Sequence, residues 1–240
     1  VLEVNPRASR TVPFVSKATR VPLAKVAALC MAGKPLSAQH VPDKLVPPYF
    51  SVKEAVFPFI KFPGADTILG PEMKSTGEVM GIGHSFSEAF LKSQAAAGQK
   101  LPGAGKVFIS VRDGDKAPVI EIARSLARLE FSLYATRGTA AALAGAGIDV
   151  IAVNKVKEGR PNVVDMIKNG DFSLIINTVE DRRSAVQDSY AIRHAALEGR
   201  VTYYTTMAGA RAACAGLLGA HELRPYRLQR LHAGLAQPAP

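Results

Sequence analysis

The stretch FSLYATRGTAAALAGAGIDVIAV, residues 131–153, decides the fold. Residues 131–136 are a short run of apolar and aromatic side chains, which is typical of a strand. Residues 137–147 are rich in Ala and end in Gly, which predicts a short helix. Residues 149–153 form a second short run that is typical of a strand. A strand, a helix and a strand in this order predict two parallel strands joined by a crossover helix.

The same alternation continues on both sides of this stretch. Further elements are expected as strands at residues 106–111, 172–178 and 201–206 and as helices at residues 117–130, 162–170, 182–199 and 207–220. Short apolar strands that alternate with helices are typical of a parallel sheet covered on both faces. The sequence therefore predicts an α/β domain from residue 106 onward.

Two helices are expected before this domain. Residues 22–34 have helical spacing, with Pro22 suited to the first turn. Residues 85–98 begin with a Ser, carry a Glu three positions later and end in Gly, which are start and stop signals of a helix. Residues 41–83 contain six prolines. This composition predicts an extended segment with short strands rather than a domain with its own core.

The chain is thus expected to have three parts. Residues 1–20 read as a strand followed by a loop rich in Ser, Thr and Arg. Residues 21–105 read as a connecting segment with helices and short strands, and residues 106–240 as the α/β domain.

The composition is that of a globular protein, with 48% hydrophobic and 21% charged residues. No apolar run reaches about 18 residues, so no membrane partner is expected. Glu3, Asn5 and Pro6 interrupt any apolar core of a signal peptide. Cys30 and Cys214 lie in helix-like surroundings without metal-ligand spacing. We therefore expect a reduced, cytoplasmic protein with two buried thiols.

The net charge of +10 raises nucleic acid as an alternative partner. The Lys and Arg residues are dispersed, however, and many stand singly beside Gly, Thr or Ser. This distribution favours phosphate sites for small anions, and no nucleic-acid partner is expected.

Polar side chains gather where the expected strands end. In parallel sheets ligands bind at the carboxyl ends of the strands. These positions hold Ser110, Thr136, Arg137, Gly138, Thr139, Asn154, Lys155, Asn177, Thr178, Tyr204 and Thr205, with Lys116 nearby. Helix N-termini follow two of the loops and favour an anion. Such residues also cap helices without binding anything, but four loops on one edge favour a phosphate pocket.

The first residues show a different pattern. Glu3, Asn5 and Arg7 alternate, so in a strand their side chains would share one face. A carboxylate, a carboxamide and a guanidinium on one face suit a metal ion that carries phosphates.

Several long strings resemble the C-terminal part of the large subunit of carbamoyl-phosphate synthase. They are LEVNPRASRTVPFVSKAT (2–19), PPYFSVKEAVFPFIKFPGADTILGPEMKSTGEVMGIG (47–83), ISVRDGDK (109–116), ATRGTA (135–140), VNKVKEGRPNVVDMIKNG (153–170) and IINT (175–178) with a following RR pair. The resemblance runs in order from residue 1 to about residue 215 and fades in the last 25 residues.

The resemblance implies that residues 1–20 end the second ATP-grasp domain of this ligase. Glu3 and Asn5 would then bind Mg²⁺ or Mn²⁺ between the ATP phosphates, and Arg7 would contact phosphate during catalysis. The remaining ATP-binding lobes, the rest of the large subunit and the glutaminase small subunit would be partners. With Val1 in place of an initiating Met, the chain is expected to be a fragment that is inactive alone.

The resemblance also implies that residues 106–240 form a methylglyoxal-synthase-like, Rossmann-like allosteric domain. In this family it binds UMP as inhibitor and IMP as activator and joins large subunits into oligomers. The implied nucleotide site comprises Ser110, Lys116, Thr136, Thr139, Lys155, Asn177 and Thr178. Val179, Glu180 and Asp181 depart from the family pattern by removing a hydroxyl and adding negative charge.

An ornithine activator site is the third implication. Its residues would be Glu54, Tyr203 and Thr205, which offer a carboxylate for the ornithine ammonium and two hydroxyls. The alternative for the whole chain is a free-standing methylglyoxal synthase acting on a triose phosphate, with Asp113 or Asp115 as its carboxylate. That alternative leaves residues 1–105 unexplained.

Overall fold

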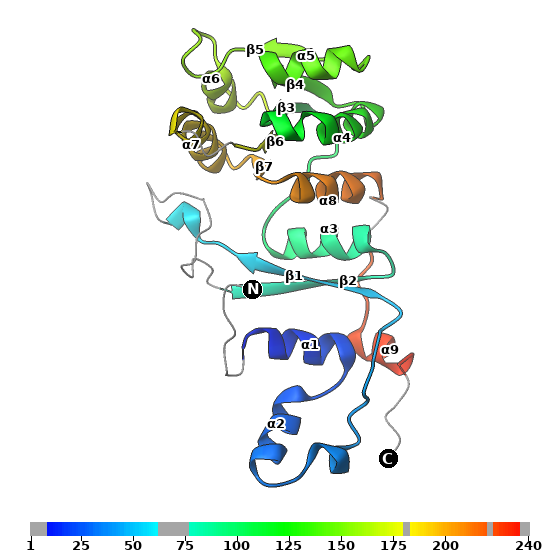
Figure 1. Cartoon of the computed structure of the whole chain (residues 1–240). Helices are drawn as coiled ribbons and strands as arrows, with labels where there is room; N and C mark the ends of the chain where they lie inside the picture. Colours follow the sequence, from blue (N-terminus) through cyan, green and yellow to red (C-terminus); the bar gives the residue numbers. More distant parts are fainter. Residues whose placement is uncertain (1–8, 62–76, 180–182, 220–222, 236–240) are drawn as a thin grey trace.

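A computed structural model describes residues 9–61, 77–179, 183–219 and 223–235. Its largest feature is a five-stranded parallel sheet with the strand order β5-β4-β3-β6-β7 (Figure 1). The strands are β3 (Lys106–Ser110), β4 (Ser132–Thr136), β5 (Ile151–Val153), β6 (Leu174–Asn177) and β7 (Thr202–Tyr204). The predicted strands are therefore confirmed.

Strand β3 is the middle of this sheet. Val107 pairs with Leu133 of β4 on one side and with Leu174 of β6 on the other. The chain adds β4 and β5 to one side of β3 and then crosses over to add β6 and β7 to the other. The direction of the connections therefore reverses between β3 and β6.

Helices cover both faces of the sheet, as the apolar strands predict. One face is covered by α4 (Lys116–Arg128), α5 (Arg137–Gly145) and α8 (Met207–Leu218), which pack on side chains such as Ile109 and Leu133. The other face is covered by α6 (Val163–Lys168) and α7 (Arg183–Glu198), which pack on Phe108 and Ile175. Both faces of the sheet are covered by helices and shielded from water, which explains why polar and apolar residues do not alternate along these strands.

A second, two-stranded sheet precedes this domain. Strands β1 (Phe50–Val56) and β2 (Gly77–Gly83) are antiparallel. Helix α3 (Phe86–Ala96) lies between this sheet and α8 (Figure 1). The predicted cap is present, because Ser85 Oγ accepts a hydrogen bond from Glu88 N at 3.2 Å.

Helix α3 approaches β2 at Gly81. A Cβ atom at this position would overlap the carbonyl oxygen of Ala89 and lie 2.5 Å from Ser93 N. A glycine is therefore required where the helix backbone crosses the strand.

Helices α1 (Thr11–Thr19), α2 (Leu23–Met31) and α9 (Leu228–Ala233) form the far end of the molecule (Figure 1). Helix α9 lies against α1, where His232 Nε2 is 2.6 Å from the carbonyl oxygen of Lys17. Short 3₁₀ turns occur at η1 (Leu36–Gln39), η2 (Phe59–Lys61) and η3 (Asp113–Asp115). The helix expected at residues 22–34 is thus present as α2.

Two expectations for this end are wrong. Residues 11–19 form a helix rather than a loop, because α1 is fixed by tertiary contacts: Ala18 is buried, and Tyr49 donates a 2.6 Å hydrogen bond to its carbonyl oxygen. Cys30 is exposed rather than buried, whereas Cys214 is buried as expected. The strand expected before α1 falls on residues outside the described part.

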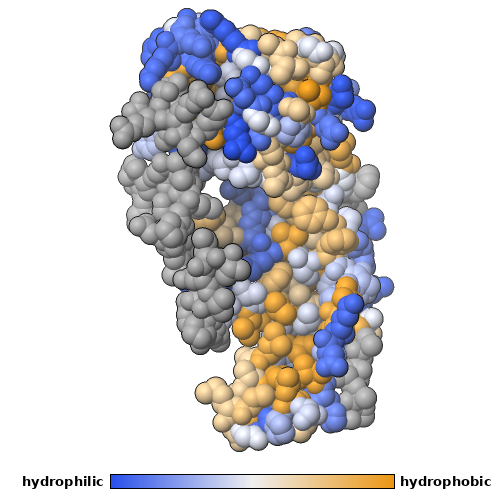
Figure 2. Space-filling view, viewed as in Figure 1, coloured by the Kyte–Doolittle hydropathy of each residue, from blue (hydrophilic) through white to orange (hydrophobic). Residues whose placement is uncertain are grey.

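An apolar surface covers much of this far end (Figure 2). Helix α2 has no buried residue although its side chains are largely apolar, and Met31 is 90% exposed. Val46 and Leu36 are exposed as well. Exposed apolar patches of this kind mark contact surfaces for other parts of a protein.

Candidate functional site

The edge of the parallel sheet where its strands end contains a topological switch point. The connection from β3 runs through α4 to β4, and the connection from β6 runs through α7 to β7 on the opposite side. The two loops therefore separate above the carboxyl ends of β3 and β6. In open α/β sheets such a separation forms the ligand-binding crevice.

Three predicted residues meet beside this crevice. The hydroxyl of Thr136 lies 3.3 Å from those of Ser110 and Thr139, and Thr139 Oγ1 also accepts a hydrogen bond from Val111 N. Thr136 and Thr139 are buried, whereas Ser110 is half-buried. Because the ends of β3 and β4 are adjacent, the sheet register brings these residues together.

Lys116 lies beside the start of α5, the helix that carries Thr139. A Cβ atom on Gly138 would lie 3.3 Å from Lys116 Nζ, so the ammonium lies against the first turn of α5. Lys116 also pairs with the exposed carboxylate of Asp113 at 2.7 Å. The first turn of α5 has free N–H groups and a cation beside it, which together favour an anion.

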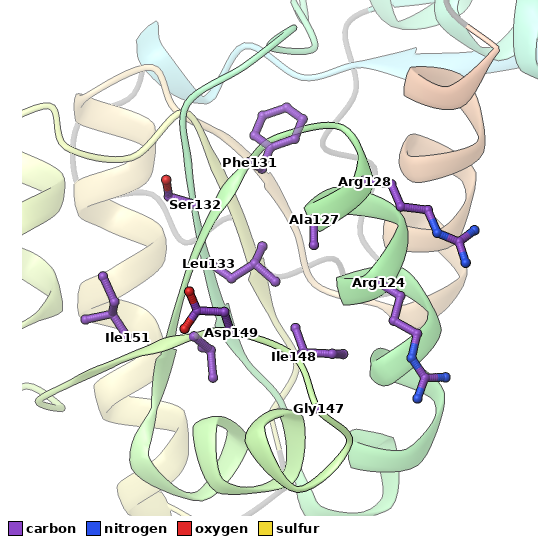
Figure 3. Close-up of a pocket in the computed structure, with 11 residues that line it drawn as sticks. Arg124, Ala127, Arg128, Phe131, Ser132, Leu133, Gly147, Ile148, Asp149 and Ile151 are labelled. Carbon is purple, nitrogen blue, oxygen red and sulfur yellow. The ribbon is translucent and has the colours of Figure 1, made fainter.

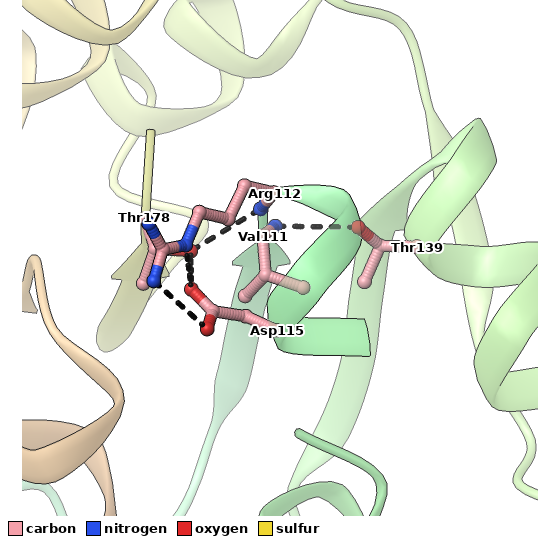
Figure 4. Close-up of polar contacts among 5 residues, drawn as sticks. All are labelled: Val111, Arg112, Asp115, Thr139 and Thr178. Carbon is pink, nitrogen blue, oxygen red and sulfur yellow. Dashed lines mark hydrogen bonds and ion pairs between the residues drawn. The ribbon is translucent and has the colours of Figure 1, made fainter. Parts of the chain in front are cut away.

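Asp115 is a buried carboxylate that joins the two loops of the switch point (Figure 4). Thr178 Oγ1 donates a 2.8 Å hydrogen bond to Asp115 Oδ2, and Arg112 Nε donates to the same oxygen at 2.9 Å. Arg112 N in turn donates to Thr178 Oγ1 at 3.2 Å. The sequence offered Asp115 only as a catalytic candidate, whereas the geometry gives it a structural role.

The side chains of two further predicted residues, Asn177 and Thr178, form hydrogen bonds with other parts of the protein. Thr178 Oγ1 has its hydrogen directed at Asp115, and Thr178 N donates to the carbonyl oxygen of Ser110 at 3.0 Å. Asn177 Nδ2 donates to Ser189 Oγ of α7 at 2.8 Å. Thr178 therefore fixes the loop after β6 to Asp115, and Asn177 fixes the end of β6 to α7.

Lys155 lies in the loop after β5, and its side chain is exposed. Its backbone N–H donates to Glu158 Oε2 at 3.0 Å, and Arg137 Nη2 donates to Asn154 Oδ1 at 3.1 Å. These contacts hold the β5 loop next to the start of α5. The structure does not bring the Lys155 side chain into contact with Ser110, Thr136 or Thr139.

The residues expected to bind ornithine line a second cavity, of about 400 Å³. Its lining comes from β1 and the turn η2 that follows it, from α3 and from the end of β7, and it includes Glu54, Phe57, Phe59, Gln94, Tyr203, Tyr204 and Thr205. Glu54 receives hydrogen bonds from Gln94 Nε2 and from Ser93 Oγ, the latter at 2.7 Å. The sequence missed Gln94, because it lies within a helix that looked purely structural, and it placed Tyr204 at the strand ends without assigning it to this site.

A third cavity, of about 540 Å³, lies at the opposite edge of the sheet, where β4 and β5 begin. Its lining includes Arg124, Arg128, Ser132 and Asp149. Figure 3 shows both arginine side chains pointing away from Asp149. The charged side chains of this cavity therefore do not surround a common position for a ligand.

Glu3, Asn5 and Arg7 lie outside the described residues, as do Glu180 and Asp181. Within the ranges that the structure describes, no three His, Cys, Asp or Glu side chains are grouped as they would be around a metal ion. In the same ranges, no helix combines the length and the apolar character needed to cross a membrane.

Comparison with known proteins identifies close relatives. Residues 118–205 match the family model of the MGS-like domain. The chain is 62% identical over 98% of its length to the carbamoyl phosphate synthase large chain of Ralstonia nicotianae. The corresponding identities are 57% for that of Pseudomonas aeruginosa and 56% for that of Pasteurella multocida, again over 98% of the chain.

The chain spans 22% of the length of each of these relatives. The domain match and the five-stranded parallel sheet agree with the expected Rossmann-like fold. Over nearly its whole length, this chain is therefore a homologue of part of the carbamoyl phosphate synthase large chain, and it fits the C-terminal region with its MGS-like domain.

Proposed function

We propose that this chain is an effector-binding part of a carbamoyl phosphate synthase and that it binds a nucleoside monophosphate, UMP or IMP, at the switch point. The observation that carries the proposal is the convergence of Ser110, Thr136 and Thr139 beside the first turn of α5. Hydroxyls and free backbone N–H groups together suit the oxygens of a phosphate.

The positive charge for this ligand comes from two lysines. Lys116 already lies against Gly138 and would exchange its partner Asp113 for a phosphate oxygen. Lys155 is exposed on the neighbouring loop and would close over the ligand from there. Asn177 and Thr178 support the crevice by holding its second wall. Val179, which follows Thr178, has no hydroxyl. This wall therefore lacks a hydrogen-bond donor at that position and favours effectors that do not need one.

For the second cavity we propose ornithine as the ligand. Glu54 would accept hydrogen bonds from an ammonium group, and the hydroxyls of Tyr203 and Thr205 would contact the rest of the molecule. The carboxylate of Glu54 has no cationic partner among the described residues. An ammonium ligand would supply one.

The parent enzyme would be an ATP-dependent ligase of the cytoplasm that makes carbamoyl phosphate from bicarbonate and ammonia for arginine and pyrimidine synthesis. Glu3 and Asn5 offer the oxygen ligands that Mg²⁺ or Mn²⁺ takes, and Arg7 offers charge for the ATP phosphates. We propose that this part alone does not make carbamoyl phosphate.

Three protein partners belong to this proposal. They are the rest of the large subunit, the glutaminase small subunit and further large subunits joined through the MGS-like domain. The exposed apolar surface on α2 suits the first of them.

A triose-phosphate lyase is the less favoured function. Such an enzyme needs a carboxylate that can take a proton from its substrate. Asp115 is occupied by Thr178 and Arg112, and Asp113 is exposed and paired with Lys116. Both carboxylates are therefore engaged with other side chains, and neither is a free base.

Titration of the purified chain with UMP, IMP and dihydroxyacetone phosphate separates these functions. Thermal stability and release of methylglyoxal are followed in parallel. Stabilisation by a nucleotide without turnover is the expected result. Turnover of the triose phosphate would overturn the proposal, and so would the absence of any nucleotide effect.

A further inference from the structure

The cavity around Glu54 is joined to the parallel-sheet domain by a short chain of hydrogen bonds. The Tyr204 hydroxyl donates to Gln94 Oε1 at 2.7 Å, and Gln94 Nε2 donates to Glu54 Oε1. Gln94 is only 5% exposed. Three elements, β7, α3 and β1, therefore meet through one buried carboxamide.

Glu54 and Tyr204, at the two ends of this chain of hydrogen bonds, fix the orientation of the Gln94 carboxamide. The carboxylate of Glu54 can only accept hydrogen bonds, so it requires the NH₂ group of Gln94 to face it. The carbonyl oxygen of Gln94 must then find a donor on its other side. Tyr204 supplies that donor, and a buried carbonyl without one would be costly.

The tyrosine is itself held in place. A Cβ atom on Gly209 would lie 3.1 Å from Tyr204 Cδ1, so the ring packs against the first turn of α8. Burial, together with the negative charge of Glu54, raises the pKa of Tyr204 well above its ordinary value of 10.0. The hydroxyl therefore keeps its hydrogen throughout the neutral range.

The partners of Glu54 differ from those of three other carboxylates, which form ion pairs. Glu88 pairs with Lys92, Asp171 with Lys106 and Asp115 with Arg112. Glu54 receives hydrogen bonds from neutral groups of Ser93 and Gln94. Neutral donors hold a carboxylate in position without cancelling its charge, which leaves the charge available to a ligand.

We infer that Tyr204 is a positioning residue of this cavity, which acts through Gln94 to hold the Glu54 carboxylate toward an ammonium group. This inference rests on the proposed binding of ornithine. It adds two residues to the site: Gln94, which contacts Glu54, and Tyr204, which contacts Gln94. Neither of them needs to contact the ligand.

The test measures ornithine binding by calorimetry on the 240-residue chain and on three variants, Tyr204→Phe, Gln94→Leu and their combination. Tyr204→Phe is expected to weaken binding about five- to tenfold, since it removes one hydrogen bond and leaves a carbonyl unpaired. If Tyr204 acts through Gln94, the double variant binds no more weakly than Gln94→Leu alone. A general loss of structure would not produce this pattern.

Three controls separate the possible failures. Tyr190→Phe removes an exposed hydroxyl elsewhere and should leave binding unchanged. UMP affinity should stay the same in Tyr204→Phe, which would show that the parallel-sheet domain remains folded. Glu54→Gln should abolish ornithine binding.

The outcomes then have distinct meanings. Absence of ornithine binding by the wild-type chain, or full binding by Glu54→Gln, would overturn the proposed ligand of this cavity. Loss of binding in Glu54→Gln but not in Tyr204→Phe would overturn only the positioning role. Additive effects in the double variant would also overturn it, because Tyr204 would then act independently of Gln94.

Discussion

Asp115 and Thr178 are separated by 63 positions in the sequence, yet Thr178 Oγ1 donates a 2.8 Å hydrogen bond to Asp115 Oδ2. This bond closes the gap between the loops that follow β3 and β6. Both side chains are buried. A hydrogen bond from a buried hydroxyl to a carboxylate contributes more than one between neutral groups.

Thr178→Val is therefore expected to destabilise the fold by about 1–3 kcal/mol, because it leaves Asp115 with one donor fewer while the side-chain shape is kept. The free energy of unfolding in urea measures this change. Ser132→Ala, which removes an exposed hydroxyl of β4, is the control and should be close to neutral. Equal stabilities of Thr178→Val and the wild type would show that Asp115 has no structural role here.

Lys155→Ala is expected to weaken UMP or IMP binding about tenfold, because it removes one charge from the proposed phosphate site. Lys168→Ala is the matched control. Lys168 is an exposed lysine at the C-terminal end of α6, in the segment that leads into the start of β6 and therefore away from the carboxyl ends of the strands. Calorimetric titration of both variants with UMP and IMP measures this difference in affinity. Equal affinities of the two variants would place the phosphate elsewhere.

Gly81→Ala is expected to destabilise the protein by about 3 kcal/mol or more, since its methyl group would overlap backbone atoms of α3. Gly77 lies in the same strand and has no atom within 4 Å of an added Cβ. Gly77→Ala should therefore be nearly neutral. Thermal unfolding of the two variants compares them directly, and similar melting temperatures would contradict the close contact between α3 and β2.

Tyr204 is expected to make the free energy of unfolding depend on pH in the alkaline range. Its pKa is raised in the folded state by burial and by Glu54, so its contribution is fully present below about pH 10, the unfolded pKa. The contribution is lost as the pH rises above 10, because the unfolded chain then releases the proton first. Tyr204→Phe should flatten this part of the stability profile.

Urea unfolding at a series of pH values from 8 to about 11 tests this expectation. Tyr190→Phe removes a tyrosine outside the cavity and should keep the profile of the wild type. If Tyr204→Phe and Tyr190→Phe lose stability in parallel, the Tyr204 hydroxyl is not held as described.

The sequence predicted the parallel-sheet domain well because its strands are buried on both faces. Residues 107–109 and 174–176, for example, are uniformly apolar, and each of these strands is followed by a helix. The meeting of Ser110, Thr136 and Thr139 could also be predicted, since parallel strands place their carboxyl ends at one edge.

Features that depend on partners far along the chain could not be predicted. Helix α1 has many β-branched and Ser or Thr residues, and its formation depends on contacts such as that between Tyr49 and Ala18. Asp115 and Gln94 are ordinary polar residues in the sequence. Their roles arise only when Thr178 and Tyr204, respectively, are brought next to them.

The central position of β3 also has a consequence for local opening of the structure. Val107 and Ile109 are paired on both sides and fully buried, so their amide hydrogens should exchange with solvent only when the whole domain unfolds. Strand β5 has three residues at the edge of the sheet, with Ile151 half exposed, and should exchange by local fraying. The crevice is therefore expected to rest on the slowest-exchanging strand, whereas the loop with Lys155 extends from an edge strand that frays more easily.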